Sequence, residues 1–311
     1  MNSTHQEYIA QKFSKRVLIN QSMKKHSTFG IGGKAKVLFL PKQRLEIKEM
    51  LKYSMKNNIN IMFIGSGSNL LISDKGFDGI LISLKRAFKH IEFSDNGDIV
   101  AGAGVMLGRM VNQAIRRKFK GLESLVGVPG TLGGALFMNA GAYGTEISKC
   151  FVSAKLMNMA GDEIEVLKES VGFSYRASEF PEDCLLLEAR FKCEIGDIDK
   201  IKKNKATFSL SRKTNQPLSF RSAGSIFKNP SNDLAAGYLI DKAGLKGVCK
   251  GGAMISDKHA NFIVNLGSAK SSDVIYLIKL IREKVLSDFD VLLKLEIKLI
   301  GFKKEILNDL D

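Results

Sequence analysis

The 311-residue chain contains no tryptophan, only four cysteines, four histidines and five prolines. It has no apolar run of about 18 residues, which a membrane-spanning helix requires, and no secretory-type hydrophobic segment at its start. Cys150, Cys184, Cys193 and Cys249 form no C-x-x-C pair and have no histidine close by in the sequence. These absences argue against a zinc site, a disulfide framework and membrane insertion. We therefore expect a cytoplasmic protein without a resident metal.

Acidic residues are also scarce, because the chain has 47 Lys and Arg but only 32 Asp and Glu. The resulting net charge of +15 favours an anionic partner, such as a nucleic acid, a membrane surface or a phosphorylated small molecule. Residues 1–60 hold twelve basic and three acidic residues, so +9 of the charge lies there. The length and a hydrophobic content of 44% indicate a globular chain of two or three domains.

Hydrophobic periodicity predicts mixed α/β structure in two halves. Residues 1–35 read as a basic N-terminal arm that ends in loop-type sequence, and a basic helix or connector over 197–213 marks the expected domain boundary. Apolar residues at helical spacing predict helices over 43–57 and 107–115. Two further helices are predicted at 233–243 and 272–287. Strands are predicted at 36–40, 59–64, 80–84, 98–101, 151–159, 163–167, 185–193, 261–266 and 291–300. The turn residues at 160–162 predict that the strands at 151–159 and 163–167 form a hairpin.

Three glycine-rich segments carry candidate binding chemistry. Residues 65–70 (GSGSNL) follow a buried strand, and such a loop either turns the chain or cradles phosphate oxygens with its N–H groups. A dinucleotide fingerprint would need glycine in place of Leu70. Residues 100–108 have the spacing G-x-G-x-x-x-G, which favours a structural turn. Residues 127–144 hold six glycines in eighteen positions, which favours a backbone-lined groove for a flat, phosphate-bearing ligand.

Taken in order, the motifs resemble the UDP-N-acetylenolpyruvoylglucosamine reductase family, the flavoenzymes of bacterial peptidoglycan synthesis. The resemblance runs from Thr28 to Gly301. Its motifs are TFGIGGKA (28–35), GSGSNLLISDKGFDGILI (65–82), GVPGTLGGALFMNAGAYG (127–144), YR (175–176), SAGSIFKNP (222–230), HANFIVNLG (259–267) and LEIKLIG (295–301). The short connection between Arg176 and Ser222 resembles the shorter, second structural type of the family.

This resemblance implies an α/β (α+β) fold. A two-subdomain FAD-binding domain of the vanillyl-alcohol oxidase/PCMH type would precede a smaller C-terminal α/β substrate-binding domain. The expected boundaries are 1–35 for the arm, 36–200 for the FAD-binding domain (subdomains at about 36–105 and 106–200), 217–303 for the substrate-binding domain and 304–311 for a tail. FAD would bind without a covalent bond, with contacts expected from Gly65, Ser66, Gly67, Ser68, Asn69, Leu70, Gly130, Thr131, Gly133, Gly134, Asn139 and Ala140.

The resemblance also implies a reaction. NADPH would reduce the flavin, and hydride would then pass to the β-carbon of the enolpyruvyl ether of UDP-N-acetylglucosamine enolpyruvate, giving UDP-N-acetylmuramate. Ser225 matches the family's proton donor to the α-carbon, Arg176 its active-site arginine and Glu296 its carboxylate. A guanidinium stays charged and binds a carboxylate bidentately, which suits that arginine. Tyr175, Lys228 and Asn229 match substrate-binding positions.

The role of Glu296 stays open at this point. Apolar residues alternate with charged ones over 293–299, so Glu296 should point away from the apolar face of its strand. It would then orient Ser225 or a water molecule, or help to polarise the enol.

Two other functions are consistent with parts of the sequence. The first is an FAD-dependent oxidase of the same fold, but residues 127–144 lack the histidine that often links FAD covalently in such enzymes. The second is a basic nucleic-acid-binding protein, but the basic stretches lack interleaved aromatic residues. We therefore expect no nucleic-acid partner. We also expect the protein to be a monomer.

The chain departs from the family pattern at Ser27, Ser66, Ala177, Asn215 and Arg221, where Asn, Gly, Asp, Arg and Pro are usual.

Overall fold

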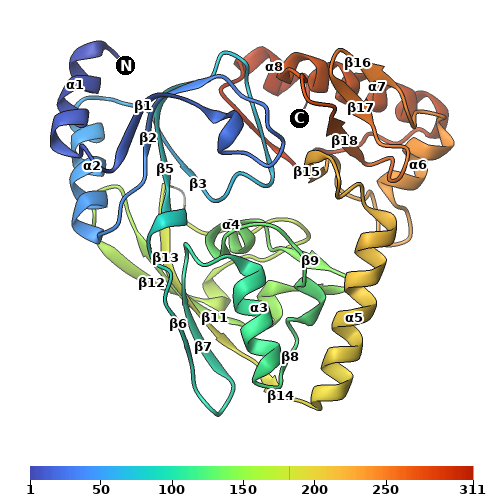
Figure 1. Cartoon of the computed structure of the whole chain (residues 1–311), viewed down its shortest axis with the longest axis horizontal. Coiled ribbons are helices and arrows are strands. Elements are labelled where there is room, and N and C mark those ends of the chain that lie inside the picture. Colours follow the sequence, from blue (N-terminus) through green and yellow to red (C-terminus); the bar gives the residue numbers. More distant parts are fainter. Residues whose placement is uncertain (182, 311) are drawn as a thin grey trace. The chain divides into compact units, whose positions relative to one another are not determined.

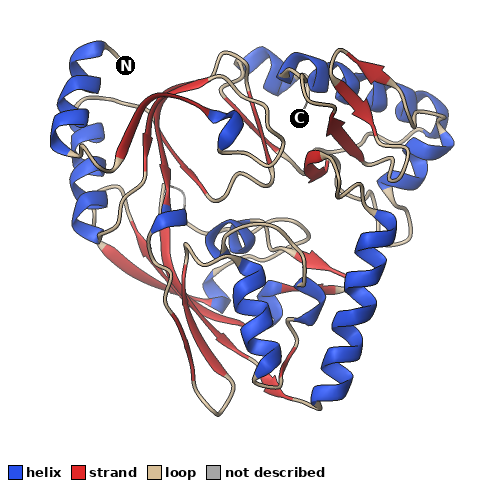
Figure 2. Cartoon of the chain, viewed as in Figure 1, coloured by secondary structure: helices blue, strands red, loops and turns tan. Residues whose placement is uncertain are grey.

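The computed structural model describes residues 1–181 and 183–310, and the chain separates into two compact units. Unit 1 comprises residues 1–18, 37–66 and 79–212, and unit 2 comprises residues 19–36, 67–78 and 213–311. Both contain helices and strands, as the sequence predicts (Figure 2). One four-stranded sheet has the order β1-β2-β5-β3. Its strands are β1 (Val17–Ser22), β2 (Lys34–Phe39), β3 (Ile61–Ile64) and β5 (Phe77–Ser83). The boundaries between the units fall within β1, β2 and β5.

The main sheet of unit 1 has five strands in the order β12-β11-β13-β7-β6 (Figure 1). Its antiparallel pairs include the predicted hairpin, in which Ala154 faces Val166. In β13, the side chains of Leu187, Ala189 and Phe191 are buried and alternate with more exposed residues, which is the pattern of a half-buried strand. The strands are β6 (Ile91–Phe93), β7 (Asp98–Gly102), β11 (Phe151–Met157), β12 (Glu163–Leu167) and β13 (Leu185–Lys192).

The helices of unit 1 are α1 (Ser3–Lys12), α2 (Arg44–Lys56), α3 (Leu107–Arg116), α4 (Leu132–Phe137) and α5 (Ile198–Asn215), whose last three residues lie in unit 2. Helix α3 buries the five apolar side chains whose spacing predicted it. Helix α5 runs beside α3, and Lys205 Nζ donates to Asn112 Oδ1 at 2.7 Å (Figure 1). The predicted connector is therefore a packed helix, and the unit boundary falls near its end.

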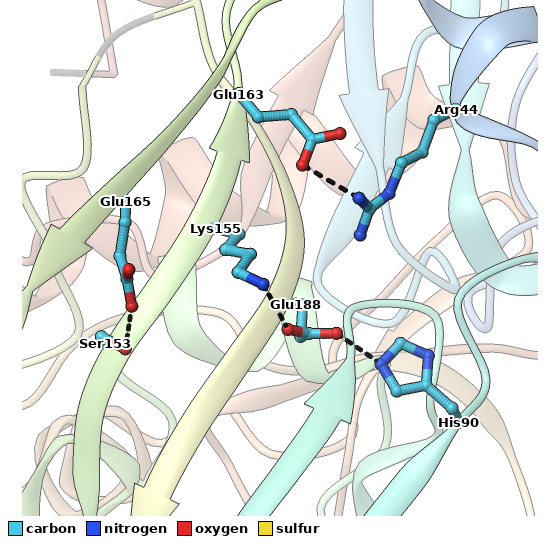
Figure 3. A network of polar contacts seen from close by, with 7 residues as sticks. All are labelled: Arg44, His90, Ser153, Lys155, Glu163, Glu165 and Glu188. Atoms are coloured by element: carbon cyan, nitrogen blue, oxygen red, sulfur yellow. Dashed lines mark hydrogen bonds and ion pairs between the residues drawn. The ribbon is translucent and has the colours of Figure 1, made fainter.

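A polar network joins α2 to the five-stranded sheet in unit 1 (Figure 3). Arg44 pairs with Glu163 at 3.0 Å, so the helix is tied to the β11–β12 hairpin. On the sheet, the Glu188 carboxylate contacts His90 Nε2 at 2.7 Å and Lys155 Nζ at 3.5 Å. Burial raises the pKa of Glu188, but these two partners outweigh it, and the pKa ends below its ordinary value.

The main sheet of unit 2 is antiparallel and has the order β15-β18-β17-β16. Helix α7 packs against this sheet and shares its hydrophobic core. Phe29, Ile31 and Leu71, from early in the chain, lie fully buried in the same core. The elements are β15 (Arg221–Ser225), α6 (Ala236–Lys242), β16 (Cys249–Lys250), β17 (Ala253–Ile255), β18 (Phe262–Asn265), α7 (Ser271–Phe289) and α8 (Lys304–Asn308).

One sequence expectation requires correction. The predicted strand over 291–300 is limited to β19 (Lys298–Ile300), which pairs in parallel with β4 (Leu70–Ile72). The preceding residues pair irregularly with the segment after β15 and so do not extend the strand. The N-terminal arm contains helix α1 and strand β1 before its loop-type end. The remaining short strands are β8 (Phe119–Lys120), β9 (Gly141–Ala142), β10 (Thr145–Glu146) and β14 (Glu194–Ile195).

Candidate active site

Two of the predicted cofactor segments meet in unit 1. A Cβ added to Gly65 would lie 2.6 Å from Thr131 Oγ1, which is closer than side-chain contacts allow. The absence of a side chain at Gly65 therefore lets the loop after β3 lie directly on the start of α4. Ser83 Oγ donates to the Gly65 carbonyl at 3.0 Å and holds the loop from the neighbouring strand. Helix α4 includes Gly133 and Gly134, so the glycine-rich segment is partly helical.

The residues of this loop suit a polar ligand with acceptor oxygens. Ser66 Oγ is buried and has no hydrogen-bond partner among the described residues. A buried hydroxyl without a partner is costly, and an incoming phosphate oxygen would satisfy it. Gly67 follows with φ +78°, a conformation that favours glycine. The loop thus combines an unused donor with glycine backbone, two features that suit a pyrophosphate cradle.

Asn139 holds the far end of the glycine-rich segment. It is fully buried with φ +40°, and its side-chain amide donates to Glu146 Oε2 and to the Ser174 carbonyl, both at 2.9 Å. Its Oδ1 accepts from the Ser148 N–H at 3.4 Å. These bonds tie the segment to the residue that precedes Tyr175. The amide of Asn139 therefore shapes the site through the protein itself, and its expected contact with FAD stays a prediction.

Arg176 lies at the tip of a tight turn in unit 1. The backbones of Ser174 and Ala177 exchange two hydrogen bonds of 3.1 Å, and Arg176 between them has φ +57°. A non-glycine residue there costs roughly 1–2 kcal/mol, so the turn holds the arginine in a strained but defined position. Its guanidinium carbon lies 5.0 Å from the Tyr175 ring centre. A Cβ at Gly141 would come within 3.1 Å of Arg176 Nη1, so the arginine reaches the glycine-rich segment.

Helix α5 braces both ends of the glycine-rich segment. The Tyr143 ring stacks on Phe208 at 4.5 Å, and the Tyr143 hydroxyl donates to the Phe208 carbonyl at 3.1 Å. At the other end, Arg212 Nη1 donates to the Gly127 carbonyl at 3.1 Å. Sequence reasoning assigned no role to these residues. The stacked aromatic pair could not be found from spacing, because its members are 65 residues apart.

Ser225 ends strand β15 in unit 2, and an irregularity of the sheet presents it. Strand β15 pairs with β18 through Ser222 and then Ser225, and the register shifts between them. Gly224, with φ +81°, lies in this bulge. Bulges turn a side chain away from the regular alternation of a strand and are frequent beside active sites. The positive φ of the bulge therefore explains why glycine precedes Ser225.

Glu296 and Ser225 belong to adjacent segments of unit 2. The Glu296 N–H donates to the Ile226 carbonyl at 2.8 Å, which places the acid beside the residue that follows Ser225. The Asn69 side chain, predicted to bind FAD, donates to the Glu296 carbonyl at 3.1 Å. Next along the chain, the Lys298 N–H donates to the Asn69 carbonyl at 3.0 Å. The structure thus joins the loop after Gly67 to the candidate acid.

Two of the three predicted substrate-binding residues, Lys228 and Asn229, follow Ser225 on the same segment. The Lys228 N–H donates to the Lys294 carbonyl at 2.9 Å, and Asn229 Oδ1 accepts the Ala236 N–H at 3.1 Å at the start of α6. Buried Asn261 holds Phe227, which lies between Ser225 and Lys228 in the chain. Its Oδ1 accepts the Phe227 N–H at 2.9 Å, and its Nδ2 donates to the Phe227 carbonyl at 2.8 Å. Asn261 belongs to the HANF motif, to which sequence reasoning assigned no role.

Comparison with known proteins gives the family. The model of the UDP-N-acetylenolpyruvoylglucosamine reductase C-terminal domain matches residues 216–300, and an FAD binding domain model matches residues 35–167. UDP-N-acetylenolpyruvoylglucosamine reductase of Carboxydothermus hydrogenoformans is 40% identical over 296 residues, covering 95% of this chain and 97% of the relative. The chain belongs to the UDP-N-acetylenolpyruvoylglucosamine reductase family. The reductase of Caldicellulosiruptor bescii is 42% identical over 288 residues, covering 91% of this chain and 90% of the relative.

The fold of this family member agrees with a solved structure. The crystal structure of the reductase from Thermus caldophilus matches with a TM-score of 0.77 at 33% identity, covering 92% of this chain and 98% of that one. The predicted α/β fold, with an FAD-binding domain and a C-terminal domain of the reductase type, is confirmed. The chain is an oxidoreductase with FAD as its cofactor. The assignments of individual site residues and the expected domain boundaries stay predictions.

The described residues lack two features, a helix that could span a membrane and a cluster of metal-binding side chains. No helix among them is both long and apolar enough to cross a bilayer. No group of three or more His, Cys, Asp or Glu side chains in that part of the chain is arranged to hold a metal ion.

Proposed function

We propose that this reductase converts UDP-N-acetylglucosamine enolpyruvate into UDP-N-acetylmuramate for peptidoglycan precursor synthesis, with NADPH as the reductant. The observation that carries the proposal is the backbone hydrogen bond from the Glu296 N–H to the Ile226 carbonyl, which pairs the segment after Ser225 with the segment that holds Glu296. Proton delivery to a reduced double bond uses a hydroxyl and an acid, and these paired segments carry one of each. This pairing occurs in a chain that matches reductases of the family over nearly its whole length.

The cofactor supplies the redox chemistry of this reaction. Bound FAD links the oxidation of NADPH to hydride delivery at the β-carbon of the enolpyruvyl group. Residues of unit 1 would hold it, with the Ser66 hydroxyl and the Gly65 backbone against its pyrophosphate and the 130–140 segment along the flavin. The absence of a side chain at Gly65 lets these two parts of the cradle lie close together.

Side chains of this protein would stabilise the negative charge that develops on the substrate and would supply the proton to its α-carbon. Hydride addition to the β-carbon leaves negative charge on the α-carbon and its carboxylate, and the Arg176 guanidinium would bind that carboxylate and stabilise the charge. The Ser225 hydroxyl would give its proton to the α-carbon, completing the saturated lactyl ether, and the serine would then recover a proton from water. Glu296 would orient the hydroxyl. Tyr175, Lys228 and Asn229 would bind the remainder of the substrate.

Rapid mixing of the FAD-loaded protein tests this proposal. Flavin absorbance should fall on mixing with NADPH and recover on mixing with the enolpyruvyl UDP-sugar under anaerobic conditions. Recovery with oxygen but not with the sugar would instead identify an oxidase. Failure of NADPH to reduce the flavin would contradict the assigned reductant, and NADH in a parallel experiment gives the nucleotide preference.

Two variants test the residue roles. Ser225→Ala should leave flavin reduction nearly unchanged and slow reoxidation by about 10²–10⁴-fold, the usual contribution of a general acid. Ser219→Ala is the matched control, because Ser219 is an exposed serine on the same segment. Arg176→Lys keeps the charge but loses the bidentate fork, so it should also impair only reoxidation. Equal losses in both half-reactions would contradict these roles.

We further propose that the protein acts as a cytoplasmic monomer. Size-exclusion chromatography with light scattering measures the mass of the FAD-loaded protein directly. A value near twice 34.2 kDa would contradict the monomer. Cell fractionation tests the location.

A further inference from the structure

Arg221 binds three backbone carbonyls of one short loop in unit 2. Its Nη2 donates to the carbonyls of Lys24 and Ser27 at 3.0 and 2.8 Å, and its Nε donates to the Thr28 carbonyl at 3.3 Å. A Cβ added to Gly30 would lie 2.6 Å from the guanidinium carbon. The guanidinium therefore lies directly against the loop, and the absence of a side chain at Gly30 leaves the space that it occupies.

We call these three hydrogen bonds of Arg221 the clamp. Arg221 lies on the strand that carries the candidate proton donor. Arg221 is the first residue of β15 and Ser225 is its last. The loop also bonds the strand in the opposite sense, because Thr28 Oγ1 donates to the Ser222 carbonyl at 2.8 Å. Two side chains, one from each segment, thus fix the start of β15 on the 24–30 loop. Between this anchor and Ser225, the bulge at Gly224 leaves the pairing with β18 irregular.

The anchored loop continues to the candidate acid through a closed circuit of hydrogen bonds in unit 2. The Thr28 N–H donates to the Gly67 carbonyl at 3.0 Å. Two residues on, the Asn69 amide donates to the Glu296 carbonyl at 3.1 Å. The Glu296 N–H then donates to the Ile226 carbonyl at 2.8 Å, which returns the circuit to the end of β15. The position of Ser225 relative to Glu296 therefore depends on the bonds at both ends of β15.

We propose that Arg221 is a positioning residue for proton delivery by Ser225. It acts by fixing the start of β15 to the 24–30 loop, and it contacts neither substrate nor cofactor. The inference rests on the proposed function and adds a residue to which the motifs assigned no role. All the donors that hold the clamp are bonded to carbonyls, so its contribution is geometric. Because β15 is bulged and not a regular strand, loss of the clamp should shift Ser225 rather than unfold unit 2.

The test compares Arg221→Gln with the control Arg116→Gln in the FAD-loaded full chain. Arg116 is exposed on α3, so the control loses the same charge without a comparable clamp. In rapid mixing, Arg221→Gln should reduce its flavin with NADPH at the rate of the control. Its reoxidation by the enolpyruvyl UDP-sugar should slow by about 10- to 100-fold, as expected for a displaced catalytic group. The KM values for both substrates should stay within about threefold of the control, since no binding contact is removed.

Two further variants separate positioning from charge. Thr28→Val removes the reciprocal bond to Ser222 while keeping the charge, so it should also slow reoxidation selectively. Arg221→Lys keeps the charge and some of the carbonyl bonds, so its reoxidation rate should lie between those of wild type and Arg221→Gln. Hydrogen exchange gives a readout independent of catalysis, and amides of 221–227 should exchange faster in Arg221→Gln than in the control.

Several results would overturn the positioning role. A rise in KM with an unchanged reoxidation rate would identify Arg221 as a substrate-binding residue. Equal slowing of both half-reactions, full rescue by lysine, or unchanged exchange over 221–227 would also contradict it. The failure of the proposed function looks different, because wild-type flavin would then not be reoxidised by the enolpyruvyl UDP-sugar at all. The exchange measurement would still report whether Arg221 fixes β15.

Discussion

The contact between Gly65 and Thr131 leads to a quantitative prediction. A Cβ at Gly65 falls 2.6 Å from Thr131 Oγ1, about 0.8 Å short of the 3.4 Å at which ordinary contacts begin. Thr131 is 3% exposed and its backbone pairs with Met106, so it has little room to withdraw. Gly65→Ala should therefore lower the free energy of unfolding of the FAD-free protein by about 1–3 kcal/mol, the usual cost of overpacking.

The same substitution should also weaken FAD binding. The loop, rather than the buried threonine, would move, and this loop is the proposed pyrophosphate cradle. A loss of about 1.4 kcal/mol in binding free energy corresponds to tenfold weaker FAD binding. Thermal or denaturant unfolding measures the first effect, and titration of the FAD-free protein, followed by flavin fluorescence, measures the second. Gly108→Ala on α3 is the control, since its Cβ would meet nothing within 4 Å.

A double-mutant cycle distinguishes this clash from a general loss of loop flexibility. Thr131→Ala removes Oγ1, and the remaining Cβ lies 3.8 Å from the added methyl group, an ordinary contact. The double variant Gly65→Ala/Thr131→Ala should be less destabilised than the sum of the single variants by about 1 kcal/mol or more. Additive effects, or a Gly65→Ala protein as stable and as tight for FAD as wild type, would refute the reasoning.

Three further predictions concern residues that support the site in unit 1. Asn139→Ala removes three hydrogen bonds of a fully buried side chain, one of them to the buried Ser148 N–H, and should lower the free energy of unfolding by about 1–3 kcal/mol, measured by denaturant titration; a loss below about 0.5 kcal/mol would contradict this. Phe208→Ala removes the stack on Tyr143 and should lower it by about 1 kcal/mol in the same assay, with faster amide exchange over 141–146. The pKa of Glu188 is lowered, so its stabilising effect exists above its ordinary pKa and disappears as the pH falls through the lowered one. The stability gap between wild type and Glu188→Gln, measured by thermal unfolding, should therefore be present at about pH 7 and shrink as the pH falls below the ordinary pKa of 4.5; a gap independent of pH would refute this.

Much of the fold could be predicted from local patterns. The helix expected over 43–57 is α2 (Arg44–Lys56), and the hairpin expected over 151–167 is β11 and β12. In α2, the buried residues recur with the helical period. The hairpin is indicated by the turn residues at 160–162 between two apolar runs. In both cases, a short window of sequence contains the information. The prediction was wrong for 291–297 because apolar alternation there comes from packing into the unit 2 core without a regular strand partner.

The candidate site was only partly predictable. The glycines at 65 and 67 indicated a close backbone approach, and the structure supplies its partners, Thr131 for Gly65 and the His26 carbonyl for Gly67. No spacing in the sequence connects Arg221 to the carbonyls of 24–28, because about 190 residues separate them. The hydrogen bond from the Asn69 amide to the Glu296 carbonyl could not be found from the sequence either, and the expected contact of Asn69 with FAD stays a prediction.

The sequence by itself determined the classes of chemistry and the elements of the fold. Its ordered glycine, YR and SAGS motifs placed the chain among flavin reductases, and the comparisons confirm the family. Only the tertiary structure decided how these motifs are held. The φ of Arg176, the bulge before Ser225 and the clamp of Arg221 each depend on contacts between residues distant in sequence or on the backbone path. Local patterns report which side chains face a core, whereas the placement of a reactive group depends on bonds that close over long separations.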